Sequence, residues 1–103
     1  MRLGTDAPEP KSRMYHLYIL ESQRTREYYV GSTEDVLHRL GQHNGEFPGL
    51  GRSTVAGRPW KLAFQASFAS RAQAMAAEKY VKRMKSRKWI AKLISGQHTL
   101  PAF

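Results

Sequence analysis

Apolar and polar residues alternate along two short segments near the start of the chain, at residues 15–21 and 26–31. A repeat of two residues is typical of a β-strand with one face buried. The polar segment Ser22-Gln23-Arg24-Thr25 lies between them, so the pattern predicts an antiparallel hairpin closed by Glu21 and Arg26.

This register assigns different residues to the two faces of the hairpin. Tyr18 is predicted to lie directly opposite Tyr29 on one face, and Gly31, opposite His16, is predicted to leave open space beside the two phenols. Tyrosine is also a common strand residue that packs half-buried with its hydroxyl in water, which is the plainer interpretation of each tyrosine alone. The other face is apolar and is expected to pack on a core, with Leu17 opposite Val30 and Ile19 opposite Tyr28.

Helical spacing of apolar residues marks three later segments. The first follows Ser32-Thr33-Glu34-Asp35, interpreted as a Ser/Thr cap with acids in the first turn, and ends near Asn44-Gly45. The second covers residues 70–84 and opens with a Ser/Gln capping box, and the third, residues 87–95, begins after Ser86 and stops at Gly96. The predicted apolar stripes are Val36, Leu37 and Leu40, then Ala77, Tyr80, Val81 and Met84, and finally Trp89, Ile90, Leu93 and Ile94.

Residues 60–68 alternate well enough to predict a third strand beside the hairpin, with Trp60, Leu62, Phe64, Ala66 and Phe68 on one face. Together these elements predict an α+β fold, a small three-stranded antiparallel sheet flanked by about three helices. Residues 45–59 form a long Gly-rich connector with few packing residues. Two interpretations of it stay open: an uninvolved flexible loop, or a role in guiding a phosphate or a strand through Arg52, Ser53, Thr54 and Arg58.

Composition limits the classes of protein that this chain can represent. Its 103 residues allow one domain with a single modest core, and the absence of cysteine excludes disulfides and thiolate metal sites. No apolar run approaches the roughly 20 residues that span a bilayer, and the start lacks the apolar segment of a secretory signal. We therefore expect a cytoplasmic protein without a membrane interaction, with a disordered arm at residues 1–13, a domain at 14–96 and a tail at 97–103.

Charge is distributed unevenly between the two halves of the sequence. Residues 1–46 hold six Lys or Arg and seven Asp or Glu, whereas residues 47–103 hold eleven Lys or Arg and one acid, Glu78. The net charge is therefore −1 for the first half and +10 for the second, which together give +9. A surface this basic favours binding to a phosphate backbone, although exposed Lys and Arg can also serve to solvate a helix.

At this point the chain resembles the GIY-YIG nuclease family. The resemblance rests on Leu17-Tyr18, on Tyr29-Val30-Gly31, on Arg39 in the first helix and on Glu78 in the second, and it covers roughly residues 14–94. The chain looks most like the small stand-alone bacterial members and the structure-specific branch. It departs from the family pattern in two places: the first motif is His16-Leu17-Tyr18 instead of Gly-Ile-Tyr, and no Asn follows Asn44.

The resemblance implies an endonuclease that hydrolyses DNA phosphodiester bonds with one divalent cation, Mg²⁺ or Mn²⁺, bound to Glu78. It implies that Arg39 neutralises charge on the phosphate, while Tyr18 orients or deprotonates the attacking water beside Tyr29. His43 lies one helical turn after Arg39, and either residue is a candidate cation to assist Tyr18. From spacing alone, Glu78 is equally suited to an ion pair with Lys82.

The implied partner is nucleic acid, most readily DNA, in repair or recombination and with selectivity for its structure. Two other classes stay open: a binding module that has lost turnover, and a nuclease subunit that docks a protein partner or forms a homodimer. The residues expected to contact nucleic acid are Arg52, Arg58, Lys82, Lys85, Arg87 and Lys88.

Overall fold

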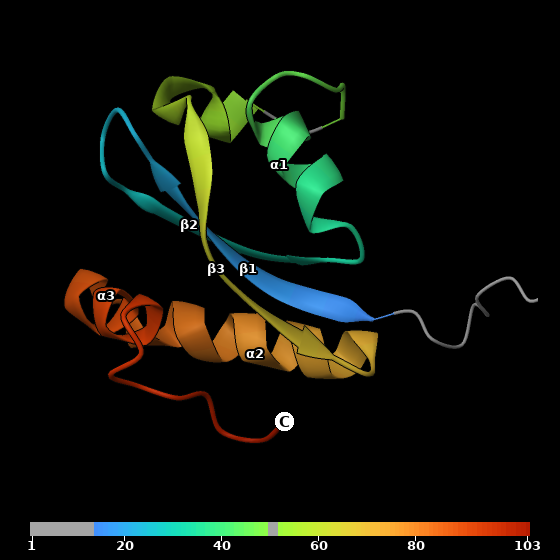
Figure 1. Ribbon diagram of the computed structural model, residues 1–103, viewed down its shortest axis with the longest axis vertical. Coiled ribbons are helices and arrows are strands. Elements are labelled where there is room, and N and C mark those ends of the chain that lie inside the picture. Colours follow the sequence, from blue (N-terminus) through green and yellow to red (C-terminus); the bar gives the residue numbers. More distant parts are fainter. Residues whose placement is uncertain (1–13, 50–51) are drawn as a thin grey trace, which may run out of the picture.

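A computed structural model describes residues 14–49 and 52–103. It shows a three-stranded antiparallel sheet with α1 and a 3₁₀ helix, η3, on one face and α2 and α3 on the other (Figure 1). This arrangement confirms the predicted α+β class. The elements are β1 (Tyr15–Ser22), β2 (Tyr28–Thr33), α1 (Val36–His43), η3 (Arg52–Gly57), β3 (Trp60–Phe68), α2 (Arg71–Met84) and α3 (Arg87–Ile94).

The central strand β1 holds the two layers together. The strand order is β2-β1-β3, so β1 pairs with both neighbours, and its residues 17–20 are each at most 1% exposed. Alternate side chains therefore enter two separate apolar clusters, one under each helical layer. The first contains Leu17, Ile19, Val30, Ala77, Val81 and Leu93, and the second contains Tyr18, Leu20, Val36 and Trp60.

The predicted register of the hairpin is wrong by two residues. Tyr18 pairs with Gly31, and Tyr29 pairs with Leu20 rather than with Tyr18. The turn lies one residue later than expected, because the backbone of Ser22 pairs with Glu27. A shift of two keeps every side chain on its predicted face, so the two tyrosines still share one face of the sheet.

The side chain of Ser22 gives the physical reason for the shifted turn. Its buried hydroxyl accepts hydrogen bonds from the backbone N–H groups of Arg24 and Thr25 and donates one to the carbonyl of Gly57 at 2.6 Å. Arg26 completes the turn in the left-handed region, with φ of 68°. A hydroxyl with three partners is more stable inside the strand end than in a solvent-exposed loop.

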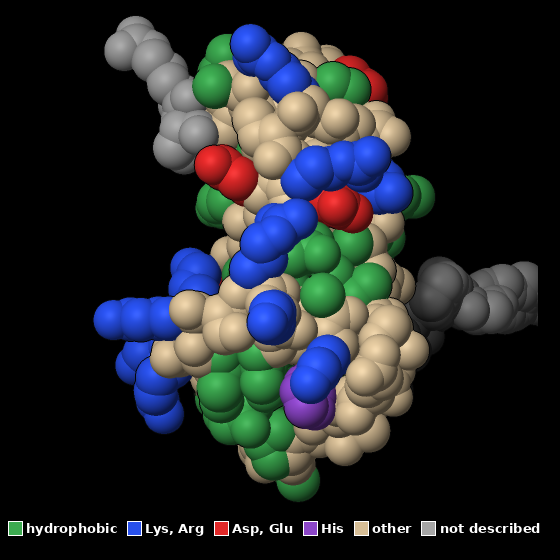
Figure 2. Space-filling model, turned by 90° about the vertical axis from the view of Figure 1, so that its left-hand side faces the viewer, with side chains coloured by type: hydrophobic (Ala, Val, Ile, Leu, Met, Phe, Trp, Pro, Cys, Tyr) green, Lys and Arg blue, Asp and Glu red, His purple; other side chains and the backbone are tan. Residues whose placement is uncertain are grey.

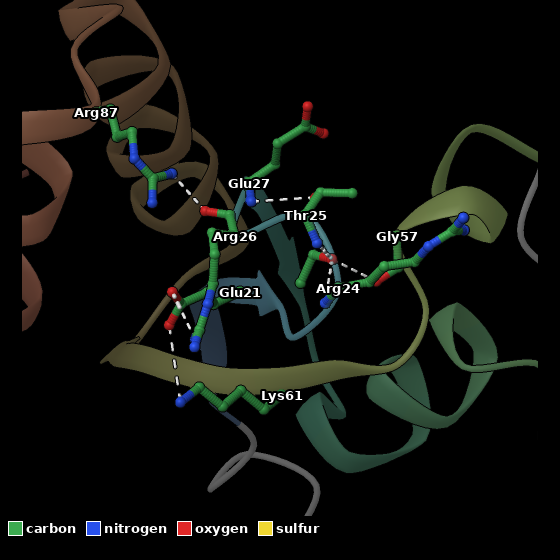
Figure 3. A network of polar contacts seen from close by, with 9 residues as sticks. Glu21, Arg24, Thr25, Arg26, Glu27, Gly57, Lys61 and Arg87 are labelled. Carbon is green, nitrogen blue, oxygen red and sulfur yellow. Dashed lines mark hydrogen bonds and ion pairs between the residues drawn. The ribbon is translucent and has the colours of Figure 1, made fainter.

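Further polar contacts tie this turn to both helical layers (Figure 3). Arg24 donates to the carbonyl of Ala56 in η3 at 2.9 Å, and Arg87 at the start of α3 donates to the carbonyl of Arg26. Arg87 also lies over the ring of Tyr28, at 4.8 Å from its centroid. The hairpin is thereby held against α3 and η3 at the same end of the sheet.

Strand β3 has the predicted bounds, but its side chains do not share one face. A bulge between the pairs Ile19–Phe64 and Leu20–Leu62 places one extra residue in β3. The extra residue reverses the alternation, so Trp60 and Leu62 pack on the α1 side while Phe64 and Phe68 pack on the α2 side. The prediction of a single apolar face is therefore wrong.

The caps of α2 and α3 match the sequence prediction, whereas α1 is capped by Asp35 rather than by a Ser or Thr and has no acidic residue in its first turn. Asp35 caps α1 by accepting from the N–H of His38 at 3.0 Å, Ser70 and Gln73 form the capping box of α2, and Ser86 caps α3. The connector before β3 is more ordered than predicted, since it contains η3. After α3, Leu100 and Phe103 pack on the first apolar cluster. Among the described residues, no helix has both the length and the apolar character to cross a bilayer.

Gly31 lies under the ring of Tyr18, so the open space expected there is filled by the phenol. A Cβ atom at this position would lie 2.6 Å from the Tyr18 hydroxyl oxygen and 2.7 Å from the ring carbon that carries it. Tyr18 is 1% exposed and has no free space in which to move away.

We predict that Gly31→Ala lowers the free energy of unfolding by about 1–3 kcal/mol, because the added methyl group overpacks a buried contact. Urea unfolding of the purified variant measures the change. The same substitution in a Tyr18→Leu background, where the phenol is absent, is expected to cost less. An equal cost in both backgrounds would show that Tyr18 is not the cause.

Candidate active site

Three aromatic side chains form a compact cluster between the sheet and α1. The ring of Tyr29 lies 4.5 Å from the ring of His43, and the Tyr18 and Tyr29 rings are 6.3 Å apart. Trp60 closes the cluster with its edge toward Tyr29, at 6.4 Å. The two tyrosines of the hairpin and the histidine of α1 are thus brought together by the hairpin and by the end of α1.

His43 links Tyr18 to the connector through a buried chain of hydrogen bonds. Its Nε2 lies 3.1 Å from the Tyr18 hydroxyl, and its Nδ1 lies 3.1 Å from the hydroxyl of Thr54. His43 is 1% exposed and Thr54 is 4% exposed. The expectation that Thr54 serves a phosphate is therefore wrong, because its hydroxyl faces the histidine and its carbonyl accepts from the Trp60 indole at 2.8 Å.

Two arginines lie close to this chain of hydrogen bonds. Arg39 lies on α1 one turn before His43 and acts on the Tyr18 hydroxyl by its charge and by a hydrogen bond. The Arg58 Nε donates to the backbone carbonyl of His43 at 2.6 Å, and its guanidinium packs against Gly45. Arg58 is half-buried, so it fixes the end of α1 in addition to any contact with nucleic acid, which stays a prediction.

The surroundings keep both Tyr18 and His43 neutral at physiological pH. Burial raises the pKa of Tyr18 well above its ordinary value, Tyr29 and Glu78 add to this, and Arg39 opposes it. Burial, followed by the charges of Arg39 and Arg58, lowers the pKa of His43 to about 4. Of the two candidate cations, Arg39 is therefore the charged one next to the phenol in this structure, and the role of His43 stays a prediction.

Glu78 lies on the other side of the sheet from the aromatic cluster. It extends from α2, where its Oε1 accepts from the Ser32 hydroxyl of β2 at 2.8 Å. Its charge contributes to the raised pKa of Tyr18, so the carboxylate and the phenol are within electrostatic reach of each other. Gly31, which pairs with Tyr18 and precedes Ser32 in β2, has no side chain that would separate the phenol from the carboxylate.

The ion pair that the sequence offered as an alternative for Glu78 is formed. Lys82 lies 2.6 Å from Oε2, and the Glu78 side chain is 23% exposed. The carboxylate still fits a divalent cation such as Mg²⁺, which binds one or two carboxylates and completes its shell with water and substrate oxygens. No group of three or more acidic, His or Cys side chains occurs within the described residues, so a fully protein-made metal cage is absent there.

The structure places the predicted nucleic-acid contacts in different environments. Lys82, Lys85, Arg87 and Lys88 are exposed, whereas the side chain of Arg52 is outside the described part of the chain. Figure 2 views the molecule from the side of the hairpin turn and α3, and Lys and Arg side chains spread over this face with few acidic ones. Arg87 additionally anchors the hairpin turn, as described above.

Three residues near the site have roles that their sequence pattern did not predict. Ser32 holds the Glu78 carboxylate, Thr54 faces the ring of His43, and Trp60 forms a wall beside Tyr29. Each becomes relevant only through a contact with a residue that is distant in the sequence. No local spacing distinguishes them from ordinary cap, loop or strand residues.

Comparison with known proteins identifies the family. The GIY-YIG catalytic domain matches residues 14–91. The chain is 47% identical over 51 residues to the structure-specific endonuclease subunit slx1 of Schizosaccharomyces japonicus, covering 48% of this chain and 19% of that protein. It is 38% identical over 81 residues to the corresponding subunit of Meyerozyma guilliermondii, covering 75% of this chain and 28% of that protein.

Bacterial relatives are closer to this chain in length. A UPF0213 protein of Streptococcus pneumoniae is 42% identical over 71 residues, which cover 68% of each chain. The solution NMR structure of a UPF0213 protein from Bacillus halodurans gives a TM-score of 0.49 at 30% identity, covering 80% of this chain and 83% of that one. The chain spans about a fifth of the Schizosaccharomyces relatives, 19% of their length. With the family domain matched over most of its described residues, the chain belongs to the GIY-YIG nuclease family.

Proposed function

We propose that this protein is a metal-dependent endonuclease that hydrolyses DNA phosphodiester bonds. The observation that supports this best is the buried Tyr18–His43 pair, with the cation of Arg39 and the carboxylate of Glu78 both close enough to act on Tyr18. A phosphodiesterase needs a group that handles the proton of the attacking water, a cation for the phosphate, and a ligand for a metal. The site offers one candidate for each.

Tyr18 and His43 can move a proton without forming a free phenolate. When His43 carries its proton on Nδ1 and donates it to Thr54, its Nε2 accepts the hydrogen of the Tyr18 hydroxyl. The Tyr18 oxygen then accepts the hydrogen bond of the attacking water. As the water oxygen bonds to phosphorus, its proton passes to Tyr18 and the original Tyr18 proton passes to Nε2 of His43. The raised pKa of Tyr18 is no obstacle to this relay, because the tyrosine stays neutral throughout.

Bound substrate would make His43 a better proton acceptor. The charge of Arg39 is one cause of its lowered pKa. A phosphodiester anion beside Arg39 offsets that charge, so the pKa of His43 rises toward the range in which it can accept a proton. Arg39 in turn stabilises the negative charge that develops on the phosphate oxygens.

Glu78 is the residue that would hold the metal, with Ser32 orienting its carboxylate. A divalent cation at this position supplies charge stabilisation for the scissile phosphate and the leaving 3′ oxygen. Lys82 pairs with Glu78 in the structure and is free to turn toward a neighbouring phosphate, because its side chain is 54% exposed. Exposed Lys85, Arg87 and Lys88 extend the same basic surface toward α3, which supports binding of DNA that weakens with salt.

The names of the relatives support two finer parts of the proposal. The fungal relatives are structure-specific endonuclease subunits, so we propose selectivity for DNA structure, in repair or recombination, and cooperation with a protein partner. A homodimer is the simpler form of such a partner. A binding module without turnover would use the same basic surface, and it is distinguished from the nuclease by the first experiment below.

We predict that Glu78→Gln abolishes metal-dependent cleavage while leaving DNA binding within about twofold, because the amide keeps the Ser32 contact but is a poor metal ligand. Tyr18→Phe is expected to reduce the cleavage rate by about 10²–10⁴-fold through loss of the proton relay. The measurement is cleavage of labelled duplex, flap, fork, four-way-junction and single-stranded DNA and RNA, with Mg²⁺ or Mn²⁺ and with EDTA.

Matched controls are available on the same elements. Tyr28→Phe changes a tyrosine of β2 that faces Arg87, and Glu27→Gln changes an exposed carboxylate of the hairpin turn; both are expected to keep wild-type activity. Full activity of Glu78→Gln would contradict the metal assignment. Binding by the wild-type protein without cleavage of any substrate would favour the binding module.

The relay requires a neutral His43, and this state predicts a pH dependence of stability. The pKa of His43 is about 4 in the folded protein and about 6.5 when unfolded, so between these values the unfolded chain binds more protons. Stability therefore falls as pH decreases through this window, by up to about 1.4 kcal/mol per pH unit from this residue.

Urea unfolding of the wild type and of His43→Gln at pH 7.0, 5.5 and 4.5 isolates this contribution, since other groups titrate equally in both proteins. We expect the stability difference between them to shrink as pH falls. His38→Gln, an exposed position on the same helix, serves as the control and should follow the wild type. A difference that does not change with pH would show that His43 is not held neutral.

A further inference from the structure

An apolar hollow lies on the outer side of α2, directly beside Glu78. It is lined by Ala72, Met75, Ala76, Glu78 and Lys79. Met75 is 52% exposed, one of the most exposed large apolar side chains among the described residues. The hollow is thus an apolar surface that shares a wall with the proposed metal ligand.

The hollow does not belong to the core of the domain. Ala74, Ala77 and Val81 form the buried stripe of α2, while Ala72, Met75, Ala76 and Lys79 follow one another at helical spacing on its outward side. The outward side of a surface helix is ordinarily polar. No described element packs over these residues, so the hollow is open to a ligand.

Basic residues flank the hollow along the same helix. Lys79 lines it, and Arg71 and Lys82 lie one turn before and two turns after Met75; each of these two forms an ion pair, with Glu34 and Glu78, and is more than half exposed. An apolar floor between cations matches a nucleotide, which has an apolar face in its base and a negative charge in its phosphate. A protein partner with an apolar segment would match the floor but not the cations.

The position of Glu78 indicates where along the DNA strand the bound nucleotide lies. A phosphate held next to the Glu78 carboxylate places an adjacent base of the same strand near Met75, with the next phosphates near Lys79 and Lys82. Within a continuous duplex that base is paired and stacked on its neighbours, so its face is not available. Beside a branch or in a single strand the face is free.

We propose that this hollow binds an unpaired nucleobase next to the scissile phosphate, and that the preferred substrate is therefore DNA with unpaired nucleotides at the point of cleavage. The inference rests on the proposed function and specifies its substrate class. The contact is between a base and the polarisable thioether of Met75, supported by the two alanines. Selection arises because a continuous duplex must first unstack a base.

Binding in EDTA tests the proposal without any turnover. Fluorescence anisotropy measures the affinity of the full-length protein for a splayed-arm DNA and for a continuous duplex of the same length. Met75→Ala is expected to weaken binding of the splayed-arm DNA by about 2–10-fold and to change duplex binding little. Met75→Leu keeps the apolar surface and should retain most of the preference. Val55→Ala removes an exposed apolar side chain of η3, 46% exposed, and should behave as wild type.

A fluorescent base gives a second, independent readout. With 2-aminopurine at successive positions around the branch, binding of the wild type should change the fluorescence at one position next to it, and Met75→Ala should remove that change. Thermal unfolding of each variant checks that it is folded, which is expected because Met75 is half-exposed.

The outcomes separate this inference from the proposed function. If Met75→Ala loses affinity equally for both DNAs, or for neither, the base-binding hollow is overturned while the nuclease proposal stays in place. No loss for either DNA is the result expected if a protein partner covers the hollow. Absence of binding to every DNA tested would overturn both.

Discussion

The ring of Tyr18 lies against the bare backbone of Gly31, and the arrangement of the site depends on this contact. Because β1 is the central strand, Tyr18 is covered by the α1 layer and its hydroxyl is removed from water. A buried hydroxyl without a partner costs about 1–3 kcal/mol, so it needs the ring of His43. His43 in turn needs Thr54, and the Thr54 carbonyl holds Trp60 at the start of β3. One close contact in the hairpin thus requires α1, η3 and β3 to take fixed positions.

The same burial that positions Tyr18 and His43 keeps both of them neutral while no substrate is bound. Desolvation is the largest cause of both pKa shifts, in opposite directions for an acid and a base, and both shifts favour the uncharged pair. The fixed charges of the site are therefore Arg39 on one side and Glu78 on the other. A reaction at this site would have to move protons along existing hydrogen bonds, and the positive charge that His43 gains would have to be offset by the substrate phosphate.

Local patterns predicted the elements, and contacts between elements decided the rest. The bounds of β3 and the caps Ser70 and Ser86 could be predicted because alternation and capping act within a few residues. The hairpin register depends on Ser22 reaching Gly57, and the bulge in β3 depends on two apolar clusters on opposite faces, so neither has a local signature. The tyrosines, Arg39 and Glu78 could be singled out because the family motif names them, whereas Ser32 and Thr54 act only as partners and carry no motif.

The site is divided by the edge strand β2, and the position of α2 along this strand decides what Glu78 can reach. The buried Ala77 and Val81 pack α2 on the sheet, and two polar contacts add to this: Ser32 to Glu78 at 2.8 Å, and Glu34 to Arg71 at 2.7 Å. These two contacts are two turns apart on the helix, so sliding or rotation of α2 would break them. Met75 lies between them on the helix and is fixed by the same constraint. The carboxylate and the apolar hollow therefore keep a constant separation. This is required if the hollow is to bind the base next to a phosphate held at Glu78.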